Sequence, residues 1–193
     1  MTLIPPIPLD LPRKRWTRAE CSTIEAAGLF DQQPVELVEG ELLLKTRKSR
    51  SHVHLVALLS GWLMSVFGAR FVNLHAPIDV APQDNPTNEP QPDALVLKRS
   101  YTGFRSVTPG PKDLELIVEV SYTSLAFDLT TKAALYARAG ISEYWVVDIA
   151  GRRLVVHRQP EGGRYGSIEA YGEDESVAPL AAADKAFRVA DVF

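Results

Sequence analysis

Cysteine is almost absent from this sequence, because Cys21 is the only one in 193 residues. A single thiol cannot form a disulfide within the chain, and it excludes a zinc site built from several cysteines. Chains without disulfides suit a reducing compartment, so we expect a cytoplasmic location. The longest apolar run, His54 to Phe67, is shorter than the roughly 20 residues that cross a bilayer. We therefore expect no membrane partner.

Several widespread active-site motifs are also missing. There is no G-x-G-x-x-G, no Walker loop, no G-x-S-x-G elbow, no H-E-x-x-H and no C-x-x-C. Nucleotide binding through those loops and serine hydrolysis through that elbow therefore have no support. The net charge of −3 argues against a protein that coats nucleic acid by bulk charge, and it leaves a local basic patch open.

The chain length suits one domain with its own hydrophobic core. Residues 1–16 are rich in proline, and their charges follow the apolar part, unlike in a signal peptide. We expect these residues to form an extended N-terminal arm. Residues 17–193, in a chain that is 46% hydrophobic and 23% charged, are then expected to form a single globular domain.

The patterns along that domain predict helices placed between strands. Thr17 and Glu20 form a capping-box pattern that begins a helix through about Ala27. A hairpin is expected to turn near Glu39 and Gly40. The other expected helices cover 52–67 and 121–138, and the expected strands cover 71–81, 92–98, 114–120, 143–149, 152–158 and 165–171. This order predicts an α/β (α+β) fold with a mixed central β-sheet flanked by helices.

Two carboxylates stand in strands that are otherwise apolar. Glu119 lies near the end of the run Leu-Ile-Val-Glu-Val, and Asp93 opens the run Asp-Ala-Leu-Val-Leu. A buried ionised carboxylate is unfavourable unless it is paired or holds a metal. Two of them on neighbouring strands would repel each other, and a divalent cation would remove that repulsion. Hard cations such as Mg²⁺ prefer this oxygen ligation.

The helix expected after Glu119 carries Asp128, Lys132 and Tyr136 at intervals of four residues. Such positions drift only about 40° per step around an α-helix, so the three side chains share a face. If that face lies toward the strand ends, the Lys132 ammonium can reach the metal site. It would there orient or help to deprotonate an attacking water, or stabilise a phosphoryl transition state.

Taken together, these motifs resemble the Uma family of restriction endonuclease-like proteins, which belongs to the PD-(D/E)XK nuclease superfamily. The resemblance covers most of the chain and implies a restriction endonuclease-like fold. It also implies a Mg²⁺-dependent endonuclease that hydrolyses phosphodiester bonds of nucleic acid, with DNA expected. The residues that carry it are Val35 to Leu42, His52, Pro92-Asp93, Glu119-x-Ser121, Asp128, Lys132, Tyr136 and Gly140 to Asp148.

The resemblance implies roles for particular residues. Asp93 and Glu119 would ligate Mg²⁺ or Mn²⁺, with the backbone carbonyl of Val120 as a further ligand. The superfamily carries a lysine two residues after the glutamate, whereas this chain has Ser121 there. Uma-like sequences share this departure, and Lys132 on the following helix is expected to replace that lysine and to serve the water.

The first hairpin supplies further candidates. The resemblance implies a role at the site for an acidic residue of the hairpin, Glu36 or Glu39, although exposure to solvent is the ordinary state of both. His52 would bind phosphate or line the cleft, or would merely begin a helix. Ser121 would hold a hydrogen bond near the metal.

The other candidates have structural alternatives too. Asp93 follows Pro92 and would be an ordinary residue at the start of a strand. Lys132 and Asp128 have the spacing of a surface ion pair, and Asp128 would also serve as a helix cap. Tyr136 is more typical of packing than of chemistry.

Lys45, Arg47, Lys48 and Arg50 form the densest basic run of the sequence. The run precedes a helix N-terminus, where backbone N–H groups favour phosphate, so contact with a nucleic-acid backbone is one interpretation. A solvated loop that offsets the acidic hairpin is the other. The following helix, 52–67, is apolar on most sides, so we expect it in the core or at the contact of a homodimer.

Two functional hypotheses follow. The first is a divalent-metal-dependent nuclease. The second is a catalytically inactive module that keeps the nuclease fold and binds nucleic acid or supports an assembly.

Overall fold

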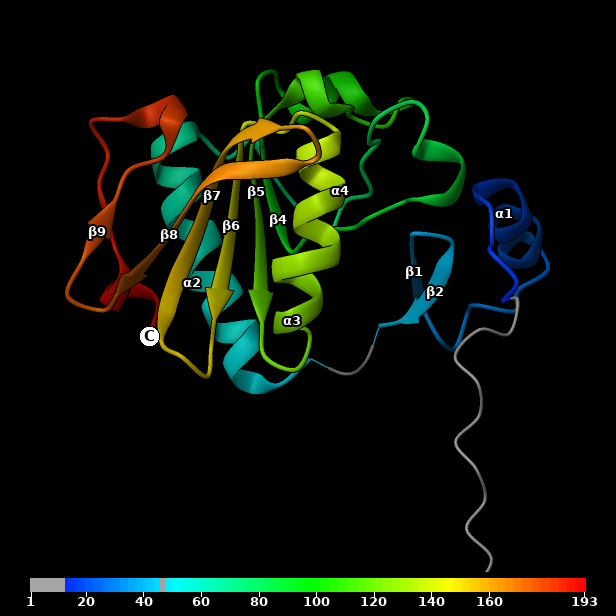
Figure 1. Cartoon of the computed structure of the whole chain (residues 1–193), viewed down its shortest axis with the longest axis horizontal. Helices are drawn as coiled ribbons and strands as arrows, with labels where there is room; N and C mark the ends of the chain where they lie inside the picture. Colours follow the sequence, from blue (N-terminus) through cyan, green and yellow to red (C-terminus); the bar gives the residue numbers. More distant parts are fainter. Residues whose placement is uncertain (1–12, 46–47) are drawn as a thin grey trace, which may run out of the picture.

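The strand β5 (Leu114–Ser121) lies inside a central sheet and is buried along almost its whole length. The computed structural model describes residues 13–45 and 48–193. Its sheet has six strands in the order β3-β4-β5-β6-β7-β8 (Figure 1). β5 and β6 are parallel and the other neighbours are antiparallel, which confirms the mixed sheet. The other strands are β3 (Val72–Leu74), β4 (Ala94–Leu97), β6 (Glu143–Asp148), β7 (Arg153–Glu161) and β8 (Arg164–Gly172).

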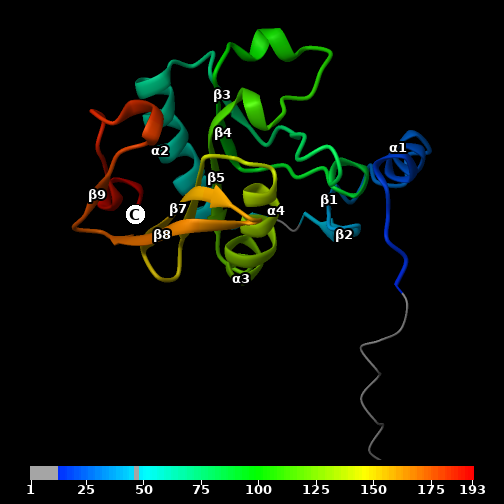
Figure 2. The ribbon, with the colours of Figure 1, turned by 45° about the horizontal axis from the view of Figure 1, so that its top comes forward.

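Helices cover both faces of the sheet, as Figure 2 shows for α2 (Arg50–Phe67) and α4 (Ala133–Arg138) on either side of β5. Leu63 of α2 belongs to a hydrophobic cluster with Val118, whereas Tyr136 of α4 belongs to a second cluster with Ile117. Successive residues of a strand point to opposite faces, so β5 contributes to both clusters. The predicted flanking helices and the burial of this strand on both faces are confirmed.

The N-terminal elements lie beside the sheet rather than in it (Figure 1). Thr17 and Glu20 form the predicted capping box at the start of α1 (Arg18–Ala26). The strands β1 (Val35–Val38) and β2 (Glu41–Leu44) form the predicted hairpin. Glu39 and Gly40 turn it with φ of 52° and 75°, a left-handed conformation that glycine adopts easily. Near the C-terminus, β9 (Ser176–Val177) pairs with β10 (Phe187–Arg188).

Two expected elements are corrected. The strand expected over 71–81 is wrong beyond Leu74, because His75 has φ of 53° and Pro77 has no N–H to donate to a neighbouring strand. The helix expected over 121–138 begins as α3 (Leu125–Phe127), continues as a π-helical segment over Asp128–Lys132 and ends as α4.

The long helix α2 is less buried than its composition indicates. Leu59 and Leu63 are buried, whereas Val53 and Leu58 are 55% and 41% exposed. Burial in the core therefore accounts for one side of the helix, and the homodimer stays a prediction.

Of the N-terminal arm, residues 1–12 lie outside the described residues, so its extended form stays a prediction too. Within residues 13–45 and 48–193, no helix combines the length and the apolar character needed to cross a membrane.

Leu63→Ala tests the packing of α2. The side chain is fully buried, so we expect the free energy of unfolding to fall by about 2–5 kcal/mol through lost burial and the cavity left behind. Leu58→Ala on the same helix is the matched control and should change it by less than about 0.5 kcal/mol. Urea unfolding followed by circular dichroism measures both. Equal effects of the two substitutions would contradict this packing.

Candidate functional site

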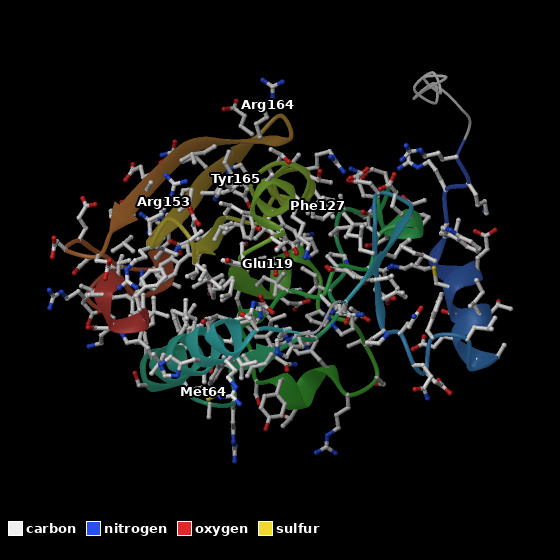
Figure 3. The ribbon with its side chains drawn as sticks, turned by 90° about the horizontal axis from the view of Figure 1, so that it is seen from below. Met64, Glu119, Phe127, Arg153, Arg164 and Tyr165 are labelled. Carbon is white, nitrogen blue, oxygen red and sulfur yellow. The ribbon has the colours of Figure 1, made fainter. Side chains whose placement is uncertain are left out.

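A cavity of about 360 Å³ opens at the end of the sheet where β5 stops and β4 begins. The hairpin, the segment before α2 and the connection from β5 to α3 border it. Figure 3 views this end of the molecule, with Glu119 near the centre and Phe127 toward the hairpin. Residues from four separate parts of the chain thus meet at one site, which we call the site cavity.

The strand register brings the two predicted carboxylates together. Ala94 of β4 pairs with Val118 of β5, so one further step along the ladder places Asp93 opposite Glu119. Side chains directly opposite in an antiparallel pair lie on the same face, with Cβ atoms about 4.5–5.5 Å apart. Asp93 also accepts a hydrogen bond from the Val120 N–H through Oδ2 at 2.9 Å. Both carboxylates border the site cavity and are more than 90% buried.

The Lys132 ammonium lies among three carboxylates. Its Nζ is 2.7 Å from Glu119 Oε1 and 2.8 Å from Glu36 Oε1. Asp128 Oδ1 lies at 3.9 Å. All four side chains are at most 10% exposed. These residues, which we call the Lys132 cluster, are a buried ion-pair network in which one cation faces three anions.

The π-helical segment positions two members of this cluster. Its hydrogen bond from the Ala133 N–H to the Asp128 carbonyl encloses one residue more than an α-helical turn. Asp128 Oδ2 accepts hydrogen bonds from Ser121 Oγ at 2.6 Å and from Ser124 Oγ at 2.7 Å. Ser121, two residues after Glu119, therefore orients an acidic residue of the cluster. π-Helical turns of this kind are frequent at functional sites.

The charges of the cluster shift its pKa values. Burial raises the pKa of the Glu119 carboxyl well above its usual range, and the Lys132 ammonium offsets this only in part. Burial likewise raises the pKa of Asp128. For Lys132, burial alone would lower the pKa, but the Glu119 and Glu36 carboxylates outweigh it and raise the pKa above its usual range. Lys132 is therefore a fixed positive charge next to a carboxyl group that ionises reluctantly.

One lysine and two histidines surround Asp93. Its Oδ1 lies 2.6 Å from Lys48 Nζ, 3.2 Å from His52 Nε2 and 3.5 Å from His75 Nδ1. Burial alone would raise the pKa of Asp93, but the hydrogen bonds from His52 and Lys48 hold it below its usual range. The surroundings thus lower the pKa of Asp93 and raise that of Glu119, so the two facing carboxyl groups differ in how readily they ionise.

The structure decides between several predicted side chains. Glu36 reaches the Lys132 cluster, whereas Glu39 pairs with Arg138 outside it. Tyr136 donates from its hydroxyl to Glu119 Oε1 at 3.3 Å, so it packs in the core and also contacts the cluster. His52 lines the site cavity.

Only part of the predicted basic run lies at the site. Lys45 and Lys48 border the site cavity, Arg50 is exposed outside it, and Arg47 lies outside the described residues. Lys48 contacts Asp93, a role that its place in a polar loop did not indicate.

Several residues at the site were not predicted, among them Gln91 and His75. Gln91 links the hairpin to the cavity, since its N–H donates to Glu36 Oε1 at 2.8 Å and its Oε1 accepts from Lys45 Nζ at 2.6 Å. His75, for which the sequence predicted no role at the site, lies beside Asp93. Gln91 precedes the Pro-Asp motif directly, and this adjacency was the only signal for it in the sequence.

The donor set fits a divalent cation. Four carboxylates and three lysines border the cavity. Burial is the main cause of the raised pKa of Glu119, and the neighbouring carboxylates add a repulsion that a dication would relieve. Within the described ranges, no three His, Cys, Asp or Glu side chains are grouped as metal ligands. Side-chain ligation would therefore rest on the pair Asp93 and Glu119. Mg²⁺ is commonly held by one or two carboxylates with water completing its shell.

Comparison with known proteins gives one family and one fold. The family model of Uma2, described as "Putative restriction endonuclease", matches residues 24–190. The crystal structure of "a putative nuclease belonging to DUF820" from Anabaena variabilis superposes with a TM-score of 0.64. It is 16% identical, and the alignment covers 82% of this chain and 89% of that one. No curated protein matches this chain. At this identity the structural likeness concerns the fold alone.

Lys132→Met tests the buried network. Removing the ammonium leaves buried carboxylates without their cation, so we expect the free energy of unfolding to fall by about 3–5 kcal/mol at pH 7. The raised pKa of Glu119 gives the sign of the pH dependence. Without the Lys132 ammonium, ionised Glu119 destabilises the folded variant, and this effect grows as pH rises above 4.5, the pKa of the glutamate in the unfolded chain. The variant should therefore lose least stability, relative to the wild type, near about pH 5.

Denaturant unfolding in the presence of a chelator, repeated from pH 5 to pH 8, measures this effect. Lys98→Met is the control, because Lys98 is exposed and lies outside the site cavity. If the two variants were equally stable at pH 7, Lys132 would not be a buried counter-ion.

Proposed function

The chain belongs to the Uma2 family, described as "Putative restriction endonuclease", and from this premise we propose that it is a divalent-metal-dependent nuclease that hydrolyses phosphodiester bonds of nucleic acid. The observation that supports the proposal most directly is the 2.7 Å contact between Lys132 Nζ and Glu119 Oε1, on the face that Asp93 shares. A lysine displaced in sequence onto a helix thereby lies beside the strand carboxylates, as the resemblance to PD-(D/E)XK nucleases implies.

Asp93 and Glu119 would hold Mg²⁺ or Mn²⁺, with the Val120 carbonyl as a further ligand. The bound cation would supply Lewis-acid stabilisation of the phosphate and would lower the pKa of a water. Asp93 is oriented for this role, because the Val120 N–H fixes one of its oxygens. Glu119 is fixed because its Oε1 accepts hydrogen bonds from Lys132 and Tyr136. The two carboxylates are thus held in place before any substrate binds.

In this proposal Lys132 acts as a charge and not as a base. Its pKa is raised, so at neutral pH the ammonium keeps its proton. It can donate a hydrogen bond to an attacking water or to a phosphate oxygen and stabilise negative charge in the transition state. Glu36 and Asp128 would keep it protonated and in place, which makes them positioning residues.

A non-catalytic module that binds nucleic acid is the second candidate. The observation that favours it is the pairing of Asp93 Oδ1 with Lys48 and His52, which occupies one oxygen of the expected metal ligand. Lys48 is 35% exposed at its side chain, so the first proposal requires it to turn toward a phosphate when substrate enters. Purified protein that binds nucleic acid but cleaves none, with any divalent metal, would establish the second candidate.

Substitution of the three central residues tests catalysis. We expect Asp93→Ala, Glu119→Ala and Lys132→Ala each to lower the cleavage rate at least about 100-fold, because each removes a charge at the reacting phosphate. A panel of labelled DNA and RNA substrates with Mg²⁺ or Mn²⁺ measures it. Glu115→Gln is the matched control, since Glu115 lies on the same strand outside the site cavity. Variants that cleave as fast as the wild type would refute the proposal.

Metal removal tests the cofactor. EDTA should abolish cleavage, and added Mg²⁺ or Mn²⁺ should restore it. Mn²⁺ binding followed by electron paramagnetic resonance should weaken at least about tenfold in Asp93→Asn and Glu119→Gln, and should be unchanged in Glu115→Gln. Full activity in EDTA, or equal Mn²⁺ binding by all three variants, would count against a metal at these carboxylates.

A further inference from the structure

The site cavity has a charged floor and an apolar mouth. Asp93, Glu119 and Lys132 on the floor are 7%, 5% and 4% exposed. Tyr122 and Leu44 border the same cavity and are each 61% exposed, among the most exposed large apolar side chains of the described chain. A phosphate suits the floor and an aromatic group suits the mouth, so the cavity offers separate environments to the two parts of a nucleotide.

The depth of the floor restricts the form of the substrate. In a duplex, the bases are paired and stacked inside and the phosphates follow a broad cylinder. A volume of about 360 Å³ is at the low end for a small-molecule pocket and admits one group of nucleotide size. A phosphate can reach carboxylates this buried when its own nucleotide leaves the stack and enters the cavity.

The mouth carries the features that bind unpaired bases. Proteins that hold single strands combine a basic groove for the backbone with aromatic rings on which bases stack. Here Lys45 and Lys48 border the cavity, and the exposed ring of Tyr122 comes from the connection that directly follows β5. Phe127 also lines the cavity and packs beside the cluster of Val38, Val80 and Leu135, which anchors that wall.

We propose that this site takes single-stranded nucleic acid and that Tyr122 stacks on the base next to the scissile phosphate. This substrate class rests on the proposed nuclease function. Tyr122 is a specificity-determining residue that acts on the unpaired base, whereas the floor residues act on the phosphate. Every base offers a π-face, so this contact favours unpaired strands over duplexes and does not depend on the base sequence.

Cleavage assays give the first test. With equal concentrations of DNA or RNA single strands and of the matching duplexes, the wild type should cleave the single strands faster. Tyr122→Ala should lower single-strand cleavage by about five- to 150-fold, through a higher KM, and Tyr122→Trp should retain the activity. Tyr101→Ala is the control, because Tyr101 is 45% exposed and lies outside the site cavity. Duplexes cleaved as fast as single strands, or an unchanged rate in Tyr122→Ala, would overturn the inference.

Binding gives a second test that does not depend on cleavage. A single-stranded oligonucleotide with 2-aminopurine should lose fluorescence on binding, since stacking on a ring quenches this base. Quenching and affinity should both fall in Tyr122→Ala and persist in Tyr101→Ala. If no substrate is cleaved but quenching depends on Tyr122, the nuclease proposal fails and the stacking contact stands. If cleavage occurs and quenching is the same in Tyr122→Ala, the stacking inference alone fails.

Discussion

The ion pair between Lys132 and Glu119 is the interaction on which the site depends. It joins a helix to the central strand of the sheet, and through Glu36 it also joins the hairpin to both. Three anions around one buried cation are favourable only while every member keeps its partners. The sheet supplies the rigid platform, and the charges hold three separate chain segments in one arrangement above it.

Much of this arrangement follows from patterns in the sequence. The apolar run around Glu119 predicted a strand buried on both faces, and both hydrophobic clusters use it. The capping box and the Glu-Gly turn predicted the start of α1 and the turn of the hairpin through local backbone chemistry. The family resemblance gave the fold, which the family match and the structural likeness confirm. The roles assigned to Asp93, Glu119 and Lys132 stay predictions that the geometry supports.

The remaining features depend on contacts between distant segments, which local patterns do not contain. Glu36 and Glu39 are equivalent by composition, and the docking of the hairpin through Leu37 and Glu89 decides which one reaches Lys132. The π-helical turn arises from packing, since nothing in Asp128–Lys132 alone distinguishes it from an α-helix. The sequence left Lys48 open as a contact to a nucleic-acid backbone or as a solvated loop residue, and in the structure it is an ion-pair partner of Asp93. In each case a contact between distant segments determines what the local sequence leaves open.

The distribution of the site over the chain has a consequence for its biosynthesis. Glu36 lies in the first hairpin, whereas Lys132 lies beyond the middle of the sequence, after β5. Such long-range contacts form late, because the loops between them must first close. While the chain emerges from the ribosome, the carboxylates of the hairpin and of β4 are present without the lysine that organises them. The complete Lys132 cluster therefore exists only in a chain that has been synthesised past the helix and has folded, so incomplete chains carry no assembled site.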